Sequence, residues 1–262
     1  MTEVPSAEDR FRTMPGTTLM ELTVLESARV TPGMQRLRLT APELAGLEYQ
    51  PGQDVMLLVA RDGGRPVRRR YSIRGLDRDE RLLTLDIVRH AGGGPGEQWV
   101  AAARPGMTVE GIGPRGKVFP DADADWHLFV GDESALAAIF SMVASLPPQA
   151  TATVILEIPD AADEQELHAQ AKADLTWLPR SGGPPGESRG PGEPGALVAA
   201  ARAVHIPAGV RPHAYLIGEA RVVLALREAL AERGFDPAAI SPKAYWGRGR
   251  GNATHGEPAR DQ

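Results

Sequence analysis

The periodicity of the apolar residues changes near residue 120, and this change constrains the possible folds more than any other feature of the sequence. Before it, short stretches with apolar residues at alternate positions, such as residues 82–90, are separated by turns, with almost no helical periodicity. Strands of this kind predict a small antiparallel barrel. Beyond it, residues 126–130 and 152–158 read as buried strands on either side of a helix, which is the βαβ pattern of a parallel sheet.

The composition excludes several classes of protein. With 262 residues, the chain is long enough for two domains, each with its own core. It has no cysteine, so disulfides, thiolate metal sites and Cys-ligated iron–sulfur clusters are excluded, and redox chemistry would need an organic cofactor or a bound metal complex. The net charge of -5 argues against general nucleic-acid binding. No apolar run suits a membrane span and the N-terminus lacks the apolar core of a signal peptide, so we expect a cytoplasmic protein.

Residues 65–74, RPVRRRYSIR, gather arginines around a Tyr-Ser pair in a stretch that suits a strand. Strand alternation places Arg69 and Tyr71 on one face, so a guanidinium that binds phosphate and a phenol that covers a flat ring can meet one ligand. Ser72 can donate to a ring carbonyl or a phosphate oxygen. The alternative is a solvated sheet edge that the arginines protect from pairing. The residues alone leave both interpretations open.

The segment after residues 82–90 is rich in glycine and then opens a helix with Pro95 near its first turn. Exposed amides at a helix start bind pyrophosphate readily, because the helix dipole favours negative charge there. A glycine run can equally be a plain loop. This segment is therefore a candidate phosphate site, and its own residues leave both interpretations open.

A second candidate site lies at the carboxyl end of the strand 126–130, since nucleotides bind parallel sheets at that edge. Residues 131–134, Gly-Asp-Glu-Ser, turn into the next helix and do not match the GxGxxG fingerprint. Asp132 or Ser134 also suits the N-cap of that helix, and capping does not compete with a site. Gly218 and Glu219 form the corresponding turn after the third strand of this half.

Together these motifs resemble the siderophore-interacting proteins, which are FAD-dependent ferric-siderophore reductases of the ferredoxin-reductase superfamily. Arg69-Arg70-Tyr71-Ser72 resembles the Arg-x-Tyr-Ser/Thr flavin motif of the superfamily. Residues 131–136, Gly-Asp-Glu-Ser-Ala-Leu, resemble the Gly-Asp-Glu-Thr/Ser-Ala-Leu signature of the family. His90, Gly94-Pro95 and Trp99 follow in the order and spacing of its flavin domain, and the resemblance covers roughly residues 19–250.

The resemblance implies an N-terminal antiparallel Greek-key flavin-binding barrel over residues 19–122. It implies a Rossmann-like parallel-sheet domain over residues 123–250, which would bind NAD(P)H and interact with the siderophore. Residues 1–18 and 251–262 are expected to be flexible tails.

The resemblance also implies a set of cofactor contacts. Arg69, Tyr71 and Ser72 would hold the isoalloxazine ring and the adjacent phosphate of FAD. The segments 86–90 and 94–97 would contact the flavin and its pyrophosphate, with His90 acting through its backbone. Their expected contact residues are Asp86, Val88, His90, Gly94, Pro95, Gly96 and Glu97, where Gly96 replaces the Ala that is usual in the family. The other expected cofactor-binding residues are Gly131, Asp132, Glu133, Ser134, Arg180, Gly218, Glu219, Tyr245 and Trp246.

The electron donor stays open between NADH and NADPH, with ferredoxin as a further alternative. Asp160, Asp163 and neighbouring acids follow the second strand, where they would suit ribose hydroxyls and repel a 2′-phosphate. Against this, Arg180 ends a stretch that looks like the Trp-Leu-x-Arg element of the family and could hold a 2′-phosphate.

The C-terminal stretch 241–250 combines aromatic rings with cations and could stack on a flavin and attract an anionic ligand. The alternative is that this stretch is only the last strand of the sheet, followed by basic residues that bind no ligand. Family members typically read Tyr-Trp-Arg-x-Gly, whereas residues 245–249 read Tyr-Trp-Gly-Arg-Gly, so the arginine has moved by one position. The expected siderophore-binding cations are Lys243, Arg248, Arg65 and Lys117.

The implied reaction passes electrons from NAD(P)H through FAD to siderophore-bound Fe(III) and releases Fe(II) for iron assimilation. No side chain needs to act as an acid or base, and no protein metal site is expected. Two alternatives remain. One is an NAD(P)H:flavin oxidoreductase that serves a protein partner such as a ferredoxin or an oxygenase, and the other is a flavin- or siderophore-binding module without turnover.

Overall fold

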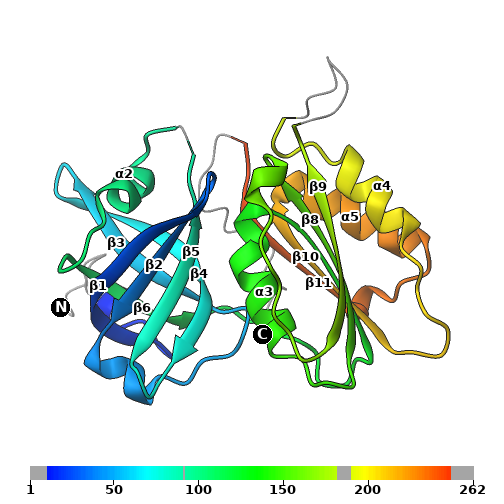
Figure 1. The fold of residues 1–262 in the computed structure, drawn as a ribbon, viewed down its shortest axis with the longest axis horizontal. Coiled ribbons are helices and arrows are strands. Elements are labelled where there is room, and N and C mark those ends of the chain that lie inside the picture. The colour runs from blue at the N-terminus through cyan, green and yellow to red at the C-terminus, as the bar shows by residue number, and fades with distance from the viewer. Residues whose placement is uncertain (1–10, 91, 182–189, 249–262) are drawn as a thin grey trace, which may run out of the picture. The chain divides into compact units, whose positions relative to one another are not determined.

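The computed structural model describes residues 11–90, 92–181 and 190–248. The chain divides into two compact units, with the boundary between Lys117 and Val118 (Figure 1).

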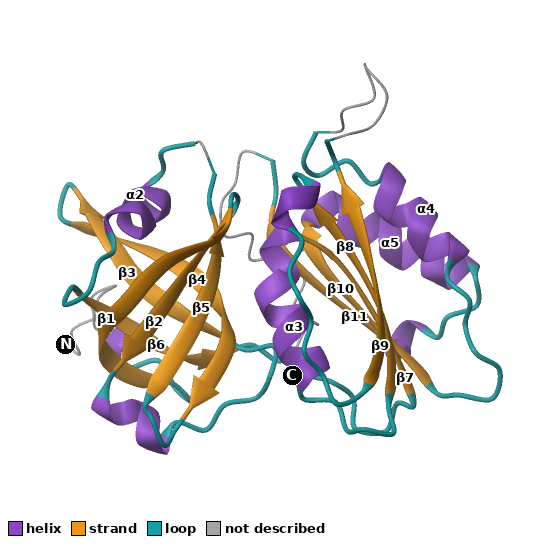
Figure 2. Cartoon of the chain, in the orientation of Figure 1, coloured by secondary structure: helices purple, strands orange, loops and turns teal. Residues whose placement is uncertain are grey.

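The first unit is a closed antiparallel barrel with the strand order β1-β2-β5-β4-β3-β6 (Figure 2). Its strands are β1 (Thr18–Thr31), β2 (Met34–Thr40), β3 (Asp54–Asp62), β4 (Arg65–Asp77), β5 (Leu82–Val88) and β6 (Thr108–Arg115). The 3-10 helix η1 (Pro42–Gly46) connects β2 to β3, and α2 (Pro95–Ala102) follows β5. Hairpins join β3, β4 and β5 in succession, and β2 pairs with β5, which is a Greek-key arrangement. The antiparallel barrel predicted from the alternating sequence is confirmed.

The barrel closes around a core of aliphatic side chains that alternate along the strands. Leu22, Leu37, Leu57, Leu83 and Leu85 are 0% exposed. Burying each leucine stabilises the fold by roughly 1.5–3 kcal/mol relative to leaving it in water. This core holds β4, which carries the arginine-rich sequence, between β3 and β5.

The start of the described chain is better anchored than the sequence indicated. Residues 1–18 were expected to be a flexible tail, but Phe11 is 2% exposed and Arg68 lies 4.5 Å from the centre of its ring. Arg12 also binds Glu110 on β6 at 2.6 Å. An aromatic anchor and an ion pair thus attach Phe11 and Arg12 to the barrel, whereas residues 1–10 lie outside the described residues.

The second unit is a parallel five-stranded sheet with the order β11-β10-β7-β8-β9. Its strands are β7 (Trp126–Asp132), β8 (Thr151–Ile158), β9 (Lys172–Pro179), β10 (Pro212–Glu219) and β11 (Ile240–Trp246). Helix α3 (Leu136–Ala144) lies on one face, and α4 (Gly195–Ala203) and α5 (Ala220–Glu232) lie on the other (Figure 1). The short 3-10 helices are η2 (Glu133–Ala135), η3 (Ala161–Asp163) and η4 (Pro237–Ala239). The predicted Rossmann-like parallel sheet is confirmed.

The strand order creates a switch point beside β7. The chain passes from β7 to β8 on one side, and β10 returns to pair with β7 on the other. In open parallel sheets, ligands bind at the carboxyl ends of the strands where the order reverses in this way. The turns after β7 and β10 are therefore the places in this unit where a nucleotide site is expected.

Strand β9 was not predicted as a strand. It pairs with β8 at the edge of the sheet, with partners from Thr151–Lys172 to Ile158–Pro179. Its exposed and partly buried residues alternate. It lacks the continuous apolar run that identified the buried strands, because an edge strand of a parallel sheet keeps part of its surface in water.

Residues 121–125, Asp-Ala-Asp-Ala-Asp, form an acidic segment before β7 that is attached to the sheet at its first residue. The backbone N–H of Asp121 donates to the hydroxyl of Tyr215 at 2.7 Å, and its carboxylate lies 3.1 Å from Nδ1 of His213. Both partners belong to β10, so Asp121 fixes the entry of the chain into the second unit.

Candidate functional site

In the first unit, Arg69 and Tyr71 on β4 converge on the start of α2. A Cβ atom placed on Gly96, the second residue of this helix, would lie 2.9 Å from Cγ of Arg69 and 3.0 Å from the hydroxyl of Tyr71. Such distances are too short for an ordinary side chain, so glycine allows the helix to approach both residues closely. The structure thus brings together three of the predicted cofactor-binding residues.

Arg69 differs from the other arginines of β4 described below in that it is not bound to a carboxylate of the described chain. Arg70 forms a bidentate ion pair with Asp54 on β3, with distances of 3.0 and 2.6 Å. Arg74 lies 3.5 Å from Asp86. Arg69 donates from Nη1 to the carbonyl of Arg68 at 2.8 Å, and it forms no ion pair with any residue that the structure describes. Its guanidinium therefore retains a positive charge and donors for an anion.

Tyr71 offers a flat ring beside that charge. It stacks on Trp99 of α2, with the ring centres 6.4 Å apart and an angle of 25° between the planes. Burial raises the pKa of the Tyr71 phenol above its ordinary value, although the charge of Arg69 acts in the opposite direction. The phenol therefore stays protonated and can donate a hydrogen bond near neutral pH.

The glycine-rich loop folds back onto α2. Gly94 is the N-cap residue of the helix and Pro95 follows at its first position, as the sequence predicted. The Glu97 carboxylate accepts a hydrogen bond from the N–H of Gly93 at 2.8 Å, and the side-chain amide of Gln98 donates to the carbonyl of the same glycine at 2.7 Å. The predicted phosphate loop is therefore held by side chains of its own helix, with the N–H of Gly93 bound to a carboxylate.

The other predicted flavin contacts on the barrel lie along β4 and β5. The Asp86 side chain is 0% exposed and binds Arg36 through two hydrogen bonds of 2.6 and 2.7 Å. Ser72 is buried on β4, Val88 ends β5, and His90 is exposed just beyond it. Because the Asp86 carboxylate is bound to arginines, we expect any contact of this residue with a flavin to come from its backbone.

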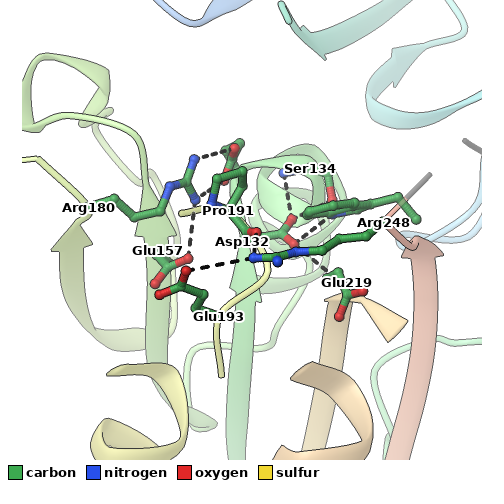
Figure 3. A network of polar contacts seen from close by, with 10 residues as sticks. Asp132, Ser134, Glu157, Arg180, Pro191, Glu193, Glu219 and Arg248 are labelled. Atoms are coloured by element: carbon green, nitrogen blue, oxygen red, sulfur yellow. Dashed lines mark hydrogen bonds and ion pairs between the residues drawn. The ribbon is translucent and has the colours of Figure 1, made fainter. Parts of the chain in front are cut away.

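In the second unit, Asp132 connects three adjacent strand ends at the switch point (Figure 3). Its Oδ1 accepts from the N–H of Ser134 at 2.9 Å and from the hydroxyl of the same residue at 2.5 Å. Its Oδ2 accepts from the N–H of Glu219 at 3.0 Å and from the indole N–H of Trp246 at 2.9 Å. Of the two predicted capping residues, Asp132 is the N-cap, and it caps the 3-10 helix η2 that leads into α3 rather than α3 itself.

Burial and charge compete with these hydrogen bonds in setting the protonation of Asp132. Burial, followed by the nearby charge of Glu133, raises the pKa of the Asp132 carboxyl to about 6, although the bonds from Ser134 and Trp246 favour the ionised form. The backbone of β10 packs closely against the Asp132 carboxylate at Gly218. Gly218 has φ +149°, and a Cβ atom there would lie 2.6 Å from Oδ2 of Asp132, so this position requires glycine.

The predicted phosphate ligand Arg180 lies just past β9, bound to two carboxylates. Its Nη1 donates to Glu133 at 2.7 Å and to Glu157 at 3.2 Å, and its Nη2 donates to Glu133 at 2.6 Å (Figure 3). Burial lowers the pKa of Arg180, but the hydrogen bonds and charges of the two glutamates outweigh it and raise the pKa overall. The guanidinium is thus permanently charged and already paired.

Glu219, another predicted cofactor-binding residue, caps the helix that it precedes. Its Oε2 accepts from the N–H of Arg221 at 2.6 Å and from that of Val222 at 3.1 Å. Asp132 and Glu219 thus bind the N–H groups at the starts of the two helical segments that follow β7 and β10. At both starts, therefore, a carboxylate of the chain binds amides that a nucleotide phosphate would otherwise use.

The predicted C-terminal ligand residues have different surroundings. Trp246 is bound to Asp132, and Arg248 donates to the carbonyl of Pro191 at 3.2 Å and lies 3.7 Å from Glu193 (Figure 3). Lys243, expected to bind the siderophore, is only 3% exposed, with its Nζ 5.2 Å from the centre of the Tyr245 ring.

The remaining two expected substrate cations, Arg65 and Lys117, are exposed. Residues 180–195 are rich in Gly, Pro, Ser and Glu, which is typical of a surface loop, and residues 182–189 of this segment lie outside the described residues. Residues 249–250 at the end of the expected second domain also lie outside them.

Sequence reasoning missed Glu157 and underused Trp99. Glu157 lies in the apolar strand β8 and is 1% exposed, so it looked like one polar residue in a buried run. Its place at the end of the second strand of a βαβ unit was a usable signal, because acidic residues there often contact a ribose. Trp99 lies four residues after Pro95, one helical turn, and that spacing could have placed its ring over the first turn of α2.

The described chain offers neither a metal cluster nor a membrane helix. Within residues 11–90, 92–181 and 190–248, no group of three His, Cys, Asp or Glu side chains could hold a metal ion. None of the helices in the same ranges has the length and apolar character that a membrane crossing requires.

Comparisons with known proteins agree with this architecture. Residues 124–249 match the family described as siderophore-interacting protein, and residues 58–118 match the siderophore-interacting FAD-binding domain. The crystal structure of a siderophore utilization protein from T. fusca is similar with a TM-score of 0.77 and 32% identity, over 92% of this chain and 96% of that one.

Two relatives from other bacteria extend the comparison. Ferric vibriobactin reductase of Vibrio cholerae is 28% identical over 249 residues, which cover 87% of this chain and 89% of the relative. The NADPH-dependent ferric-chelate reductase of Escherichia coli is 25% identical over 248 residues, which cover 86% of this chain and 92% of the relative. With its barrel, parallel sheet and both matched domains, the chain belongs to the siderophore-interacting protein family.

Proposed function

We propose that this chain is an FAD-dependent ferric-siderophore reductase that takes its electrons from a nicotinamide nucleotide. The relatives from V. cholerae and E. coli are named as ferric reductases, and the match to a siderophore-interacting FAD-binding domain supports the cofactor. The observation that carries the proposal is the convergence of Arg69 and Tyr71 on Gly96, with Arg69 forming no ion pair among the described residues.

The residues at this point fit FAD. Arg69 supplies a positive charge for a phosphate, and the first turn of α2 adds N–H groups that a helix leaves without internal acceptors. Tyr71 supplies a flat ring, backed by Trp99, for a flavin. When bound, FAD supplies the exchange between a two-electron donor and a one-electron acceptor. The protein contributes position and electrostatics, and no side chain needs to transfer a proton.

The substrate would be a ferric siderophore, held through its negative charge. Arg65 and Lys117 are exposed and can attract an anionic chelate, whereas Lys243 is buried and Arg248 lies beside Glu193. We therefore rank Arg65 and Lys117 above Lys243 and Arg248 as first contacts. Reduction to Fe(II) releases the iron, because hard oxygen ligands bind the lower charge less strongly.

An anaerobic titration of the full chain loaded with FAD tests the proposal. We expect NADH or NADPH to bleach the flavin absorbance, and a ferric siderophore added afterwards to restore it while an Fe(II) chelator captures the iron. Reduction that iron does not reverse would favour a protein acceptor instead. A chain that binds no FAD would contradict the proposal as a whole.

A further inference from the structure

Residues 190–193, Gly-Pro-Gly-Glu, form a strap that lies against the carboxyl ends of β10 and β11. Gly192 is buried, and a Cβ atom placed on it would lie 2.9 Å from Cγ of Glu219 and 3.1 Å from Cη2 of Trp246. Its φ of +75° is a conformation that glycine adopts readily. Because Glu219 ends β10 and Trp246 ends β11, the strap packs directly on the last residues of two neighbouring strands.

Arg248 holds the strap from the solvent side. Its Nη2 donates to the carbonyl of Pro191 at 3.2 Å and lies 3.7 Å from Oε1 of Glu193 (Figure 3). The side chains of Arg248 and Glu193 are 52% and 51% exposed. Ion pairs at such exposed positions contribute little, because water and salt screen them. The strap is therefore held by one buried glycine and by polar contacts that water can replace, so it can detach at low cost.

The surface beneath the strap belongs to the expected nucleotide site. Glu219 lies in the turn after β10, beside the switch point at β7, and ligands bind open parallel sheets at this edge. The indole N–H of Trp246 is bound to Asp132, and the strap contacts the opposite end of the same ring system. With the strap in place, that end of Trp246 is covered and Glu219 is only 1% exposed.

We propose that the strap covers the donor-nucleotide site and withdraws when the nucleotide binds. The inference rests on the proposed function, since it concerns access of the electron donor in that same reaction. Because binding must displace the strap, the measured affinity is the intrinsic affinity reduced by the fraction of molecules in which the strap is open. A substitution that loosens the strap therefore tightens nucleotide binding.

Gly192→Ala loosens the strap at its buried contact. The new methyl group would meet Glu219 and Trp246, so the strap must move away from both. We expect the dissociation constant of NAD⁺ or NADP⁺ to fall at least about threefold, as for a site that is closed in most molecules. Calorimetry on the full chain loaded with FAD measures this change without turnover, because an oxidised nucleotide cannot reduce the flavin.

Gly209→Ala is the matched control for this substitution. Gly209 has the same φ of +75°, but a Cβ atom there would have nothing within 4 Å. The control thus introduces the same backbone strain without a contact to the strap. Its dissociation constants should equal those of the unaltered chain.

Arg248→Gln loosens the strap at its exposed contact and separates two roles of this arginine. If Arg248 were a ligand of a nucleotide phosphate, its loss would weaken binding. Since it instead fastens the strap, we expect the dissociation constant to fall, together with KM for the reduced nucleotide. Arg202→Gln is the control, because the pair of Arg202 with Glu232 joins α4 to α5 and is similarly exposed, at 54% and 63%. It should leave binding unchanged.

Hydrogen exchange of the strap amides follows the movement itself. We expect residues 190–193 of the unaltered chain to exchange faster when NAD⁺ or NADP⁺ is bound, because the nucleotide takes the place of the strap. Slower exchange would show that the strap is a wall of the site rather than a cover, and would overturn the proposal.

The outcomes separate this proposal from the proposed function. Unchanged or weaker nucleotide binding in either Gly192→Ala or Arg248→Gln would overturn the strap as a cover and leave the reductase in place. If neither oxidised nucleotide binds any of these chains and neither reduced nucleotide bleaches the flavin, the donor assigned in the proposed function is wrong, and this proposal is overturned with it.

Discussion

Trp246 donates its indole N–H to Oδ2 of Asp132 over 2.9 Å, and this bond joins the end of β11 to the end of β7 across β10. The same oxygen accepts the N–H of Glu219 from β10 at 3.0 Å. One carboxylate oxygen thus connects three neighbouring strands at the edge where a nucleotide site is expected. The position of Trp246, a predicted cofactor-binding residue, depends on an acid 114 residues earlier in the chain.

The bond between these residues should be measurable as a coupling energy. In a double-mutant cycle of Asp132→Ala and Trp246→Phe, we expect a coupling of about 1.5–3 kcal/mol in the free energy of unfolding, typical of a hydrogen bond to a charged group. Urea denaturation of the four proteins gives this value. Pairing Trp246→Phe with Ser134→Ala is the control, because Ser134 bonds the other carboxylate oxygen. A coupling no larger than in this control would refute the link.

The raised pKa of Asp132 predicts a specific pH dependence. Because its pKa is about 6 in the fold and 3.8 in the unfolded chain, the native state binds more protons than the unfolded state between these values. Stability from this group therefore decreases as the pH rises from about 4 to about 6. We expect the stability advantage of the unaltered chain over Asp132→Ala to shrink across that window. Unfolding curves at several pH values measure it, and an advantage that grows with pH would contradict the shift.

The close approach at Gly96 predicts that a single methyl group disturbs the flavin site. In Gly96→Ala the new Cβ would meet Cγ of Arg69 and the hydroxyl of Tyr71, so both side chains must move. We expect the dissociation constant for FAD to rise by roughly tenfold, about 1.4 kcal/mol. Quenching of flavin fluorescence on binding measures this change.

Gly92→Ala provides the matched control for that substitution. Gly92 lies in the same loop, but a Cβ atom there would have nothing within 4 Å. FAD affinity should therefore stay as in the unaltered chain. Equal effects of the two substitutions would show that the contact with Arg69 and Tyr71 does not set the affinity.

The sequence predicted the parts of this protein that depend on local periodicity. Strand alternation placed Arg69 and Tyr71 on one face, and the structure brings both to the same glycine. Turn residues and Pro95 marked the start of α2 correctly. These features follow from neighbouring residues, whose geometry a strand or helix fixes.

Pairing between distant residues could not be predicted in the same way. Arg180 binds Glu133, 47 residues earlier, and Glu157, 23 residues earlier, so its pairing depends on the order of strands in the sheet. Similarly, Asp54 is the partner of Arg70 because of the register between β3 and β4, in which Asp54 lies opposite Ser72. The positions of the arginines in the sequence therefore did not reveal which of them form ion pairs.

That difference in pairing gives the last prediction, which contrasts two adjacent arginines. Arg69→Ala should weaken FAD binding by about ten- to a hundredfold, because a charge-assisted hydrogen bond to phosphate contributes roughly 1.5–3 kcal/mol. Stability should change little, since Arg69 forms no ion pair within the described chain. Arg70→Ala should instead lower the free energy of unfolding by about 3 kcal/mol, because it removes a bidentate partner from Asp54, whose side chain is 4% exposed. Fluorescence titration with FAD and urea denaturation of both variants measure the two effects. If Arg69→Ala destabilised the fold and Arg70→Ala weakened FAD binding more strongly, the roles assigned to the two residues would be reversed.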